Sequence, residues 1–134
     1  MEAVHARTGA MASIPPFHVR AARSLFWASA LFAVIMAALP QPPELPTDAM
    51  GDKLLHILAF AVLAFFANLG WPATERIRLI ERLSFLGAAI EVVQTIPALN
   101  RDADIVDWIA DSAAVVVVTT GFVLWSRWRR RSIA

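Results

Sequence analysis

Five side chains that could do chemistry stand at the ends of apolar stretches of this chain. Glu91 and Gln94 lie near the end of one such stretch, Asp107 and Asp111 open the next, and His56 lies near the start of an earlier one. Ionisable groups inside apolar segments cost free energy to bury, so they are candidates for functional roles. A carboxylate and an imidazole that titrate near neutral pH are suited to proton transfer. Glu91, His56 and Asp107 are therefore the candidate catalytic groups.

Two cations, Lys53 and Arg101, lie near these acidic groups in the sequence. Carboxylates in excess over cations are expected to take up protons, or to bind a metal or a cationic ligand. We expect no bound metal and no cofactor, because a single histidine with scattered carboxylates lacks the ligand pair of zinc-binding helices. Mg²⁺ or Mn²⁺ is the alternative, since these ions accept oxygen ligands. The candidate ligand-binding residues are Asp52, Lys53, His56, Glu91, Gln94, Arg101, Asp107 and Asp111.

Each of these groups also has a purely structural interpretation. Asp107 could pair with Arg101 and fix the turn between two helices, as structural ion pairs do. Glu91 could be the buried partner of Lys53 or of Arg101, and His56 could form a hydrogen bond between helices. Gln94, at i+3 from Glu91 on the same helix face, favours a site over an isolated ion pair.

The composition is that of a membrane protein. The chain has 134 residues, of which 58% are hydrophobic and 17% charged, against about 45–50% and about 25% in soluble domains. A helix needs about 17–25 residues to cross the bilayer. The chain has four apolar runs, and those shorter than this reach the required length with flanking residues. We predict an all-α polytopic membrane protein, a bundle of four transmembrane helices over residues 19–126, with a disordered tail at 1–18 and a basic cytoplasmic tail at 127–134. The apolar runs are Leu25–Leu39, Leu54–Trp71, Leu83–Ile96 and Ile105–Trp125.

The first apolar run has a second interpretation. Arg20 and Arg23 precede it, a pattern that also fits a cleavable signal peptide. The run ends at Leu39-Pro40 without a small-x-small cleavage site, and a long tail comes before it. We therefore expect an uncleaved transmembrane helix.

The basic residues predict the orientation. With four spans, both tails and the second interhelix loop share one side, and the other side holds only Lys53 and Arg101. Such an excess is expected on the cytoplasmic side, which predicts N-in, C-in insertion. Four tryptophans fall at the same boundary, where indole rings anchor: Trp27, Trp71, Trp125 and Trp128. The basic residues of that side are Arg7, Arg20, Arg23, Arg76, Arg78, Arg82, Arg127, Arg129, Arg130 and Arg131.

The helical rise places the polar groups of three segments at one depth. His56 lies one turn, about 6 Å, below the outer start of its helix, and Glu91 lies about 7.5 Å below the outer end of its own. Asp104, Asp107 and Asp111 follow i, i+3, i+7 spacing and share a helix face. Lipid cannot satisfy these groups, so they are expected to point at one another inside the bundle.

The same residues resemble a known family. Asp52-Lys53-Leu54-Leu55-His56, then Glu91-Val92-Val93-Gln94, then Arg101-x5-Asp107-x3-Asp111 look like the VanZ-like family of small membrane proteins. The resemblance covers residues 52–121, and the family usually has Gly where this chain has Ala114. It implies a bacterial membrane protein of the cell envelope, in a family named for teicoplanin (glycopeptide) resistance.

The predicted function is binding of an envelope lipid or lipid-linked glycan at the outer face. Arg101 and Lys53 would hold phosphate, and the carboxylates would meet sugar hydroxyls. The alternative is a hydrolase or transferase acting on such a substrate, with Glu91 or His56 as acid and base. A transporter is disfavoured because the polar groups cluster on one side, and a structural partner is the fourth interpretation. Membrane lipids and a second copy of the chain are the expected partners, and nucleic acid is not.

Overall fold

The protein is a bundle of helices. The structure is a computed structural model that describes residues 15–40, 52–99 and 103–132, and no strand occurs among them. The described residues form four α-helices and the short 3₁₀ helix η2, which follows α3. The prediction of an all-α protein is therefore confirmed. The elements are α1 (Phe17–Ala38), α2 (Asp52–Gly70), α3 (Arg76–Gln94), η2 (Pro97–Leu99) and α4 (Ile105–Arg131).

Some sequence predictions fall outside the described residues. These are most of the predicted N-terminal tail, the position of Arg101 and the side chain of Asp52. α1 begins at Phe17, so the end of the predicted tail is helical.

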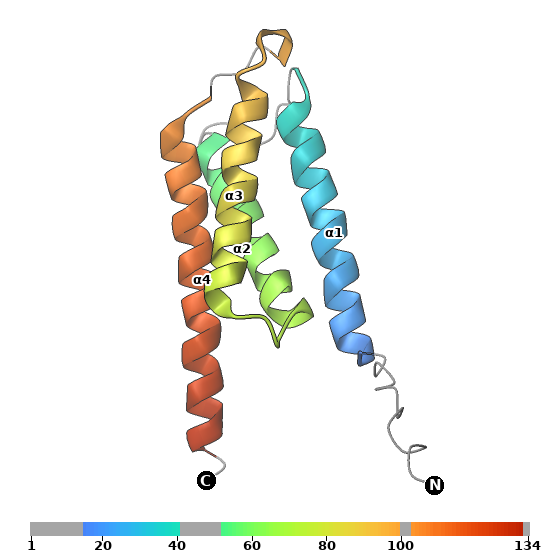
Figure 1. The fold of residues 1–134 in the computed structure, drawn as a ribbon, viewed down its shortest axis with the longest axis vertical. Helices are drawn as coiled ribbons and strands as arrows, with labels where there is room; N and C mark the ends of the chain where they lie inside the picture. The colour runs from blue at the N-terminus through green and yellow to red at the C-terminus, as the bar shows by residue number, and fades with distance from the viewer. Residues whose placement is uncertain (1–14, 41–51, 100–102, 133–134) are drawn as a thin grey trace, which may run out of the picture.

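Successive helices run in opposite directions (Figure 1). The start of α1, the end of α4 and the α2–α3 connection lie at one end, which we call the terminal end. The end of α1, the start of α2 and η2 lie at the other end, which we call the η2 end. α2 packs against both α1 and α4, and α3 packs mainly against α4. The groups predicted to share one depth all belong to the η2 end.

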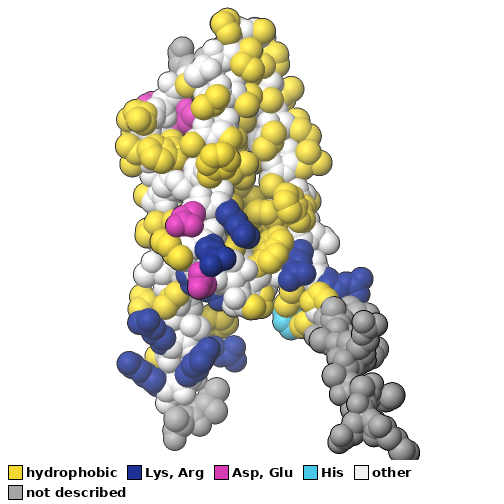
Figure 2. All heavy atoms as spheres, viewed as in Figure 1, with side chains coloured by type: hydrophobic (Ala, Val, Ile, Leu, Met, Phe, Trp, Pro, Cys, Tyr) yellow, Lys and Arg dark blue, Asp and Glu magenta, His cyan; other side chains and the backbone are white. Residues whose placement is uncertain are grey.

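Three helices are long and apolar enough to cross a membrane: α1, residues 53–70 of α2, and α4. α3 is not among them, because its 19 residues carry Arg76, Arg78, Glu81, Arg82 and Glu91. Large apolar side chains point outward on all four helices, including Leu31, Phe85 and Val117. Figure 2 shows hydrophobic side chains covering the half near the η2 end, while lysine and arginine gather toward the terminal end. An apolar exterior of this kind is what an integral membrane protein requires.

The interior consists of layers along α2 and α4. Asp111, Val115 and Thr119 are the fully buried residues of α4, and they are four residues apart on one face. Phe60 of α2 is 1% exposed and belongs to the same buried apolar cluster as Val115. This apolar layer lies between polar groups at the two ends.

Buried polar contacts also occur at the terminal end. Asn68 of α2 is 3% exposed, and its Nδ2 donates hydrogen bonds to the Ala64 carbonyl at 2.8 Å and to Thr119 Oγ1 at 3.1 Å. Arg76 Nη1 donates to Asn68 Oδ1 at 3.2 Å. We expected polar groups to cluster only at the η2 end, and this expectation is wrong. Asn68 lies inside the apolar run Leu54–Trp71, so composition alone does not reveal its buried polar contacts.

Gly87 lies where α3 contacts α2 and α4. A Cβ at this position would lie 3.4 Å from both the Phe60 and Trp108 rings and 3.5 Å from Asp111 Oδ2, which is ordinary van der Waals contact. Glu91 lies one turn further along α3. Gly121 of α4 provides a contrast, since nothing lies within 4 Å of a Cβ added there.

We predict that Gly87→Leu destabilises the bundle, because the atoms beyond Cβ would collide with Phe60, Trp108 and Asp111. Overpacking of this kind costs about 1–3 kcal/mol. Unfolding in mixed detergent–SDS micelles measures the change, with Gly121→Leu as the matched control that should lose nothing. Equal stability of the two variants would contradict close packing at Gly87.

Candidate functional site

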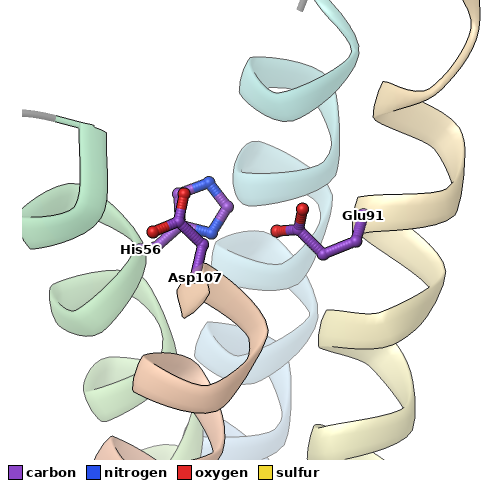
Figure 3. Close-up of side chains that lie close together, drawn as sticks. All are labelled: His56, Glu91 and Asp107. Carbon is purple, nitrogen blue, oxygen red and sulfur yellow. The ribbon is translucent and has the colours of Figure 1, made fainter. Parts of the chain in front are cut away.

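Three helices bring His56, Glu91 and Asp107 together at the η2 end. One ring nitrogen and one oxygen of each carboxylate all lie within 4.8 Å of one another. In Figure 3 the Glu91 carboxylate extends from α3 toward the His56 ring of α2 and the Asp107 side chain of α4. The meeting of three separate segments agrees with the depth argument from the sequence.

His56 is positioned by a buried carboxylate. Its Nδ1 lies 3.2 Å from Oδ2 of Asp111, which is completely buried, while the imidazole itself is 10% exposed. An ionised carboxylate only accepts hydrogen bonds, so Nδ1 is the donor when Asp111 is ionised. The contact fixes the orientation of the ring.

Glu91 is held through one oxygen. Its Oε2 accepts a hydrogen bond of 2.9 Å from the backbone N–H of Asp104. Its Oε1 is buried and has no hydrogen-bond partner among the described residues. A buried oxygen without a partner costs free energy, so this atom is a candidate to bind something else.

Lys53 joins α2 to the start of α4. Its Nζ lies 2.6 Å from Asp107 Oδ1 and 3.3 Å from Asp104 Oδ2. Asp104 caps α4, because its Oδ1 accepts the Val106 backbone N–H at 2.8 Å. That hydrogen bond and the ammonium of Lys53 lower the pKa of Asp104 below its ordinary value of 3.8.

A seam of polar contacts fixes α3 against α4 beside the cluster. Trp108 Nε1 donates to the Ser84 carbonyl at 3.0 Å, and the Ser84 and Ser112 hydroxyls lie 2.7 Å apart. Sequence reasoning missed Trp108 and Ser112. One signal was available, since Trp108 is the tryptophan that does not fall at the predicted cytoplasmic boundary.

The predicted site residues divide into those the structure places in this cluster and those it does not. His56, Glu91, Asp107, Asp111 and Lys53 belong to it. Gln94 is also buried, at 3% exposure, but none of the described hydrogen bonds joins it to the cluster. The Asp52 side chain and Arg101 lie outside the described residues.

The structural alternatives can be compared with these contacts. Asp107 pairs with Lys53, and its expected pair with Arg101 involves a residue that is not described. Glu91 accepts a hydrogen bond from the Asp104 backbone, while Lys53 pairs with Asp107 and Asp104. The expected pair of Glu91 with Arg101 again involves a residue that is not described. His56 does form the expected hydrogen bond between helices.

The cluster contains more acid than base. Glu91, Asp104, Asp107 and Asp111 supply four carboxyl groups, whereas Lys53 is the permanent cation within the described part of the cluster. Glu91, Asp107 and Asp111 are largely buried, and such an excess of buried acid favours binding of protons, hydroxyl groups or a cation.

We predict that Lys53 and Asp107 are energetically coupled, because loss of Lys53 leaves the mostly buried Asp107 carboxylate without its cation, and loss of Asp107 leaves Lys53 only its longer contact with Asp104. Lys53→Met and Asp107→Leu should each lower the melting temperature in detergent, and the double variant should lose less than the sum of the two. Arg78→Ala, in a pair with Glu75 whose side chains are 62–67% exposed, is the control and should change little. Additive losses would contradict the coupling.

We compared the chain with family models, curated proteins and solved structures. None of the three comparisons finds a match.

Proposed function

We propose that the protein crosses the bacterial cytoplasmic membrane four times, with both chain ends in the cytoplasm. α3 supports this because it lies antiparallel to α4 and exposes Phe85 and Val92 on its outer surface. Four of its charged residues stand in its first two turns, where they reach headgroup depth, and Glu91 is buried inside the bundle. The arginines near the terminal end support a cytoplasmic location for that end.

The four-span topology predicts opposite labelling of two single cysteines. Ala73 precedes α3 and Ala98 follows it, both are exposed, and the chain has no native cysteine. A membrane-impermeant maleimide should label Ala98→Cys in intact spheroplasts and Ala73→Cys only in inverted vesicles. Labelling of both from the same side would show that α3 does not cross.

We propose that the η2 end binds the headgroup of an envelope lipid or lipid-linked glycan. The observation that carries this proposal is a polar cluster beside an apolar groove at the same depth. Val34 and Ala37 of α1 line the groove together with Ala89, Ile90 and Val93 of α3. Ile90 directly precedes Glu91, so one amphiphilic molecule could place its hydrocarbon chain in the groove and its polar head at the cluster.

The charge of the cluster favours a headgroup rich in hydroxyl groups. Ionised carboxylates only accept hydrogen bonds, and sugar hydroxyls donate them. Oε1 of Glu91 has no partner among the described residues, and a sugar hydroxyl would satisfy it. Lys53 is already paired with Asp107 and Asp104. Because its side chain is 43% exposed, the ammonium can also meet a phosphate at the edge of the site.

The resemblance to the VanZ-like family supports the same assignment. It covers residues 52–121, which include His56, Glu91, Asp107 and Asp111. We propose on this basis that the protein belongs to that family and acts in the bacterial cell envelope, where the family name connects it with glycopeptide resistance.

A second candidate function is hydrolysis or group transfer on the same lipid. His56 favours it, because a fully buried Asp111 fixes the orientation of its ring, and this arrangement is suited to a general base. Glu91 and Asp107 lie within reach of the ring. Water or a carboxylate would have to be the nucleophile, since the chain has no cysteine and the nearby serines Ser84 and Ser112 are hydrogen-bonded to each other.

We predict that wild-type protein released from bacterial membrane nanodiscs retains a glycosylated or polyprenyl-linked lipid in native mass spectrometry. Glu91→Gln should reduce retention by about tenfold, since hydrogen bonds to charged groups contribute about 1.5–3 kcal/mol. Glu81→Gln changes an exposed glutamate of the same helix and should retain the lipid. If Glu91→Gln retained the lipid as wild type does, the binding proposal would fail. Recovery of a cleaved lipid from wild type alone would favour the enzyme.

A further inference from the structure

We propose that His56, Glu91 and Asp107 bind one divalent transition-metal ion, with zinc as the best fit. Each residue offers one ligand atom, and these atoms lie within 4.8 Å of one another. Zinc binds imidazole nitrogen and carboxylate oxygen at about 2.0–2.2 Å, so its ligand atoms are about 3.3 Å apart in a tetrahedron. Small rotations of the three side chains close that difference.

The surroundings of His56 are those of a metal-binding histidine. Such a histidine usually donates its other ring N–H to a carboxylate, which fixes the ring and raises its basicity. Asp111 Oδ2 occupies this position, 3.2 Å from Nδ1, and is completely buried. When Nδ1 donates to Asp111, Nε2 carries the lone pair, and this is the tautomer that binds a metal.

Glu91 provides an independent observation. The residue is 9% exposed, and its Oε1 is buried without a hydrogen-bond partner among the described residues. Figure 3 shows its carboxylate directed at His56 and Asp107. The Asp104 backbone N–H holds the other oxygen at 2.9 Å and so aims this one. A cation would satisfy an oxygen that the described protein groups leave unpaired.

Asp107 can serve the metal and Lys53 together. Lys53 contacts Oδ1, and a carboxylate has a second oxygen that can coordinate an ion. The charge also fits, because four carboxylates surround one lysine and an imidazole, and a divalent ion offsets most of the excess.

The ligand set selects the class of metal. Imidazole suits zinc and other transition metals, whereas Mg²⁺ and Ca²⁺ prefer sites made of oxygen ligands alone. Three protein ligands leave a fourth position open to water or to a substrate atom, as in catalytic zinc sites. From the sequence we expected no metal, because no helix carries a pair of ligands at zinc-binding spacing. Spacing within one helix does not reveal ligands that three helices supply together.

Zinc titration of the full-length protein in detergent, after chelator treatment, tests this inference. Wild type should bind about one zinc ion per chain by calorimetry and elemental analysis. His56→Gln and Glu91→Gln should abolish stoichiometric binding, and Asp111→Asn should weaken it by about 10–100-fold, as loss of a supporting carboxylate does. The matched controls His18→Gln and Glu81→Gln change exposed residues and should bind as wild type does.

A second variant keeps the test valid if a ligand substitution disturbs folding. His56→Cys supplies a thiolate to a chain that has no cysteine, and added Co²⁺ should then give a thiolate-to-cobalt charge-transfer band. Absence of zinc from wild type, or equal zinc binding by His56→Gln and His18→Gln, would overturn the inference. No lipid is added in these titrations, so failure of metal binding and failure of lipid binding are separate results.

Discussion

The burial of carboxylates in an apolar bundle is the constraint on which the structure of the η2 end depends. Asp111 is completely shielded from water and needs a partner, which His56 supplies from α2. That contact, together with the pairing of Lys53 with Asp107, fixes α2 against α4. Lipid offers no substitute for these partners, so the helices must meet where the charges lie.

α3 depends on the same constraint in a different way. Its Glu91 lies one turn from Gly87, where α3 contacts Phe60 of α2 and Trp108 of α4. The hydrogen bond from the Asp104 backbone to Glu91 then connects the start of α4 to the end of α3. Packing and polar contacts therefore coincide, since Gly87 and Glu91 are one turn apart on α3 and both face α2 and α4.

The two ends of the bundle have different polar interiors. At the terminal end the Asn68 amide donates a hydrogen bond to the Thr119 hydroxyl and accepts one from the Arg76 guanidinium. These groups are neutral or positively charged. At the η2 end the groups are mainly acidic, and the layer of Phe60 and Val115 separates the two. Through the described interior this layer interrupts any polar route along α2 and α4.

The sequence by itself determined the helical class and the depth of the polar groups, because composition and a fixed rise per residue are properties of each segment alone. That was enough to bring His56, Glu91 and Asp107 to one level. The tertiary structure decided which groups touch: Asp111 with His56, and Lys53 with Asp107. Those contacts depend on the rotation of each helix about its axis and on the distance between helices. Side chains from different helices set both quantities, so no spacing within one segment records them.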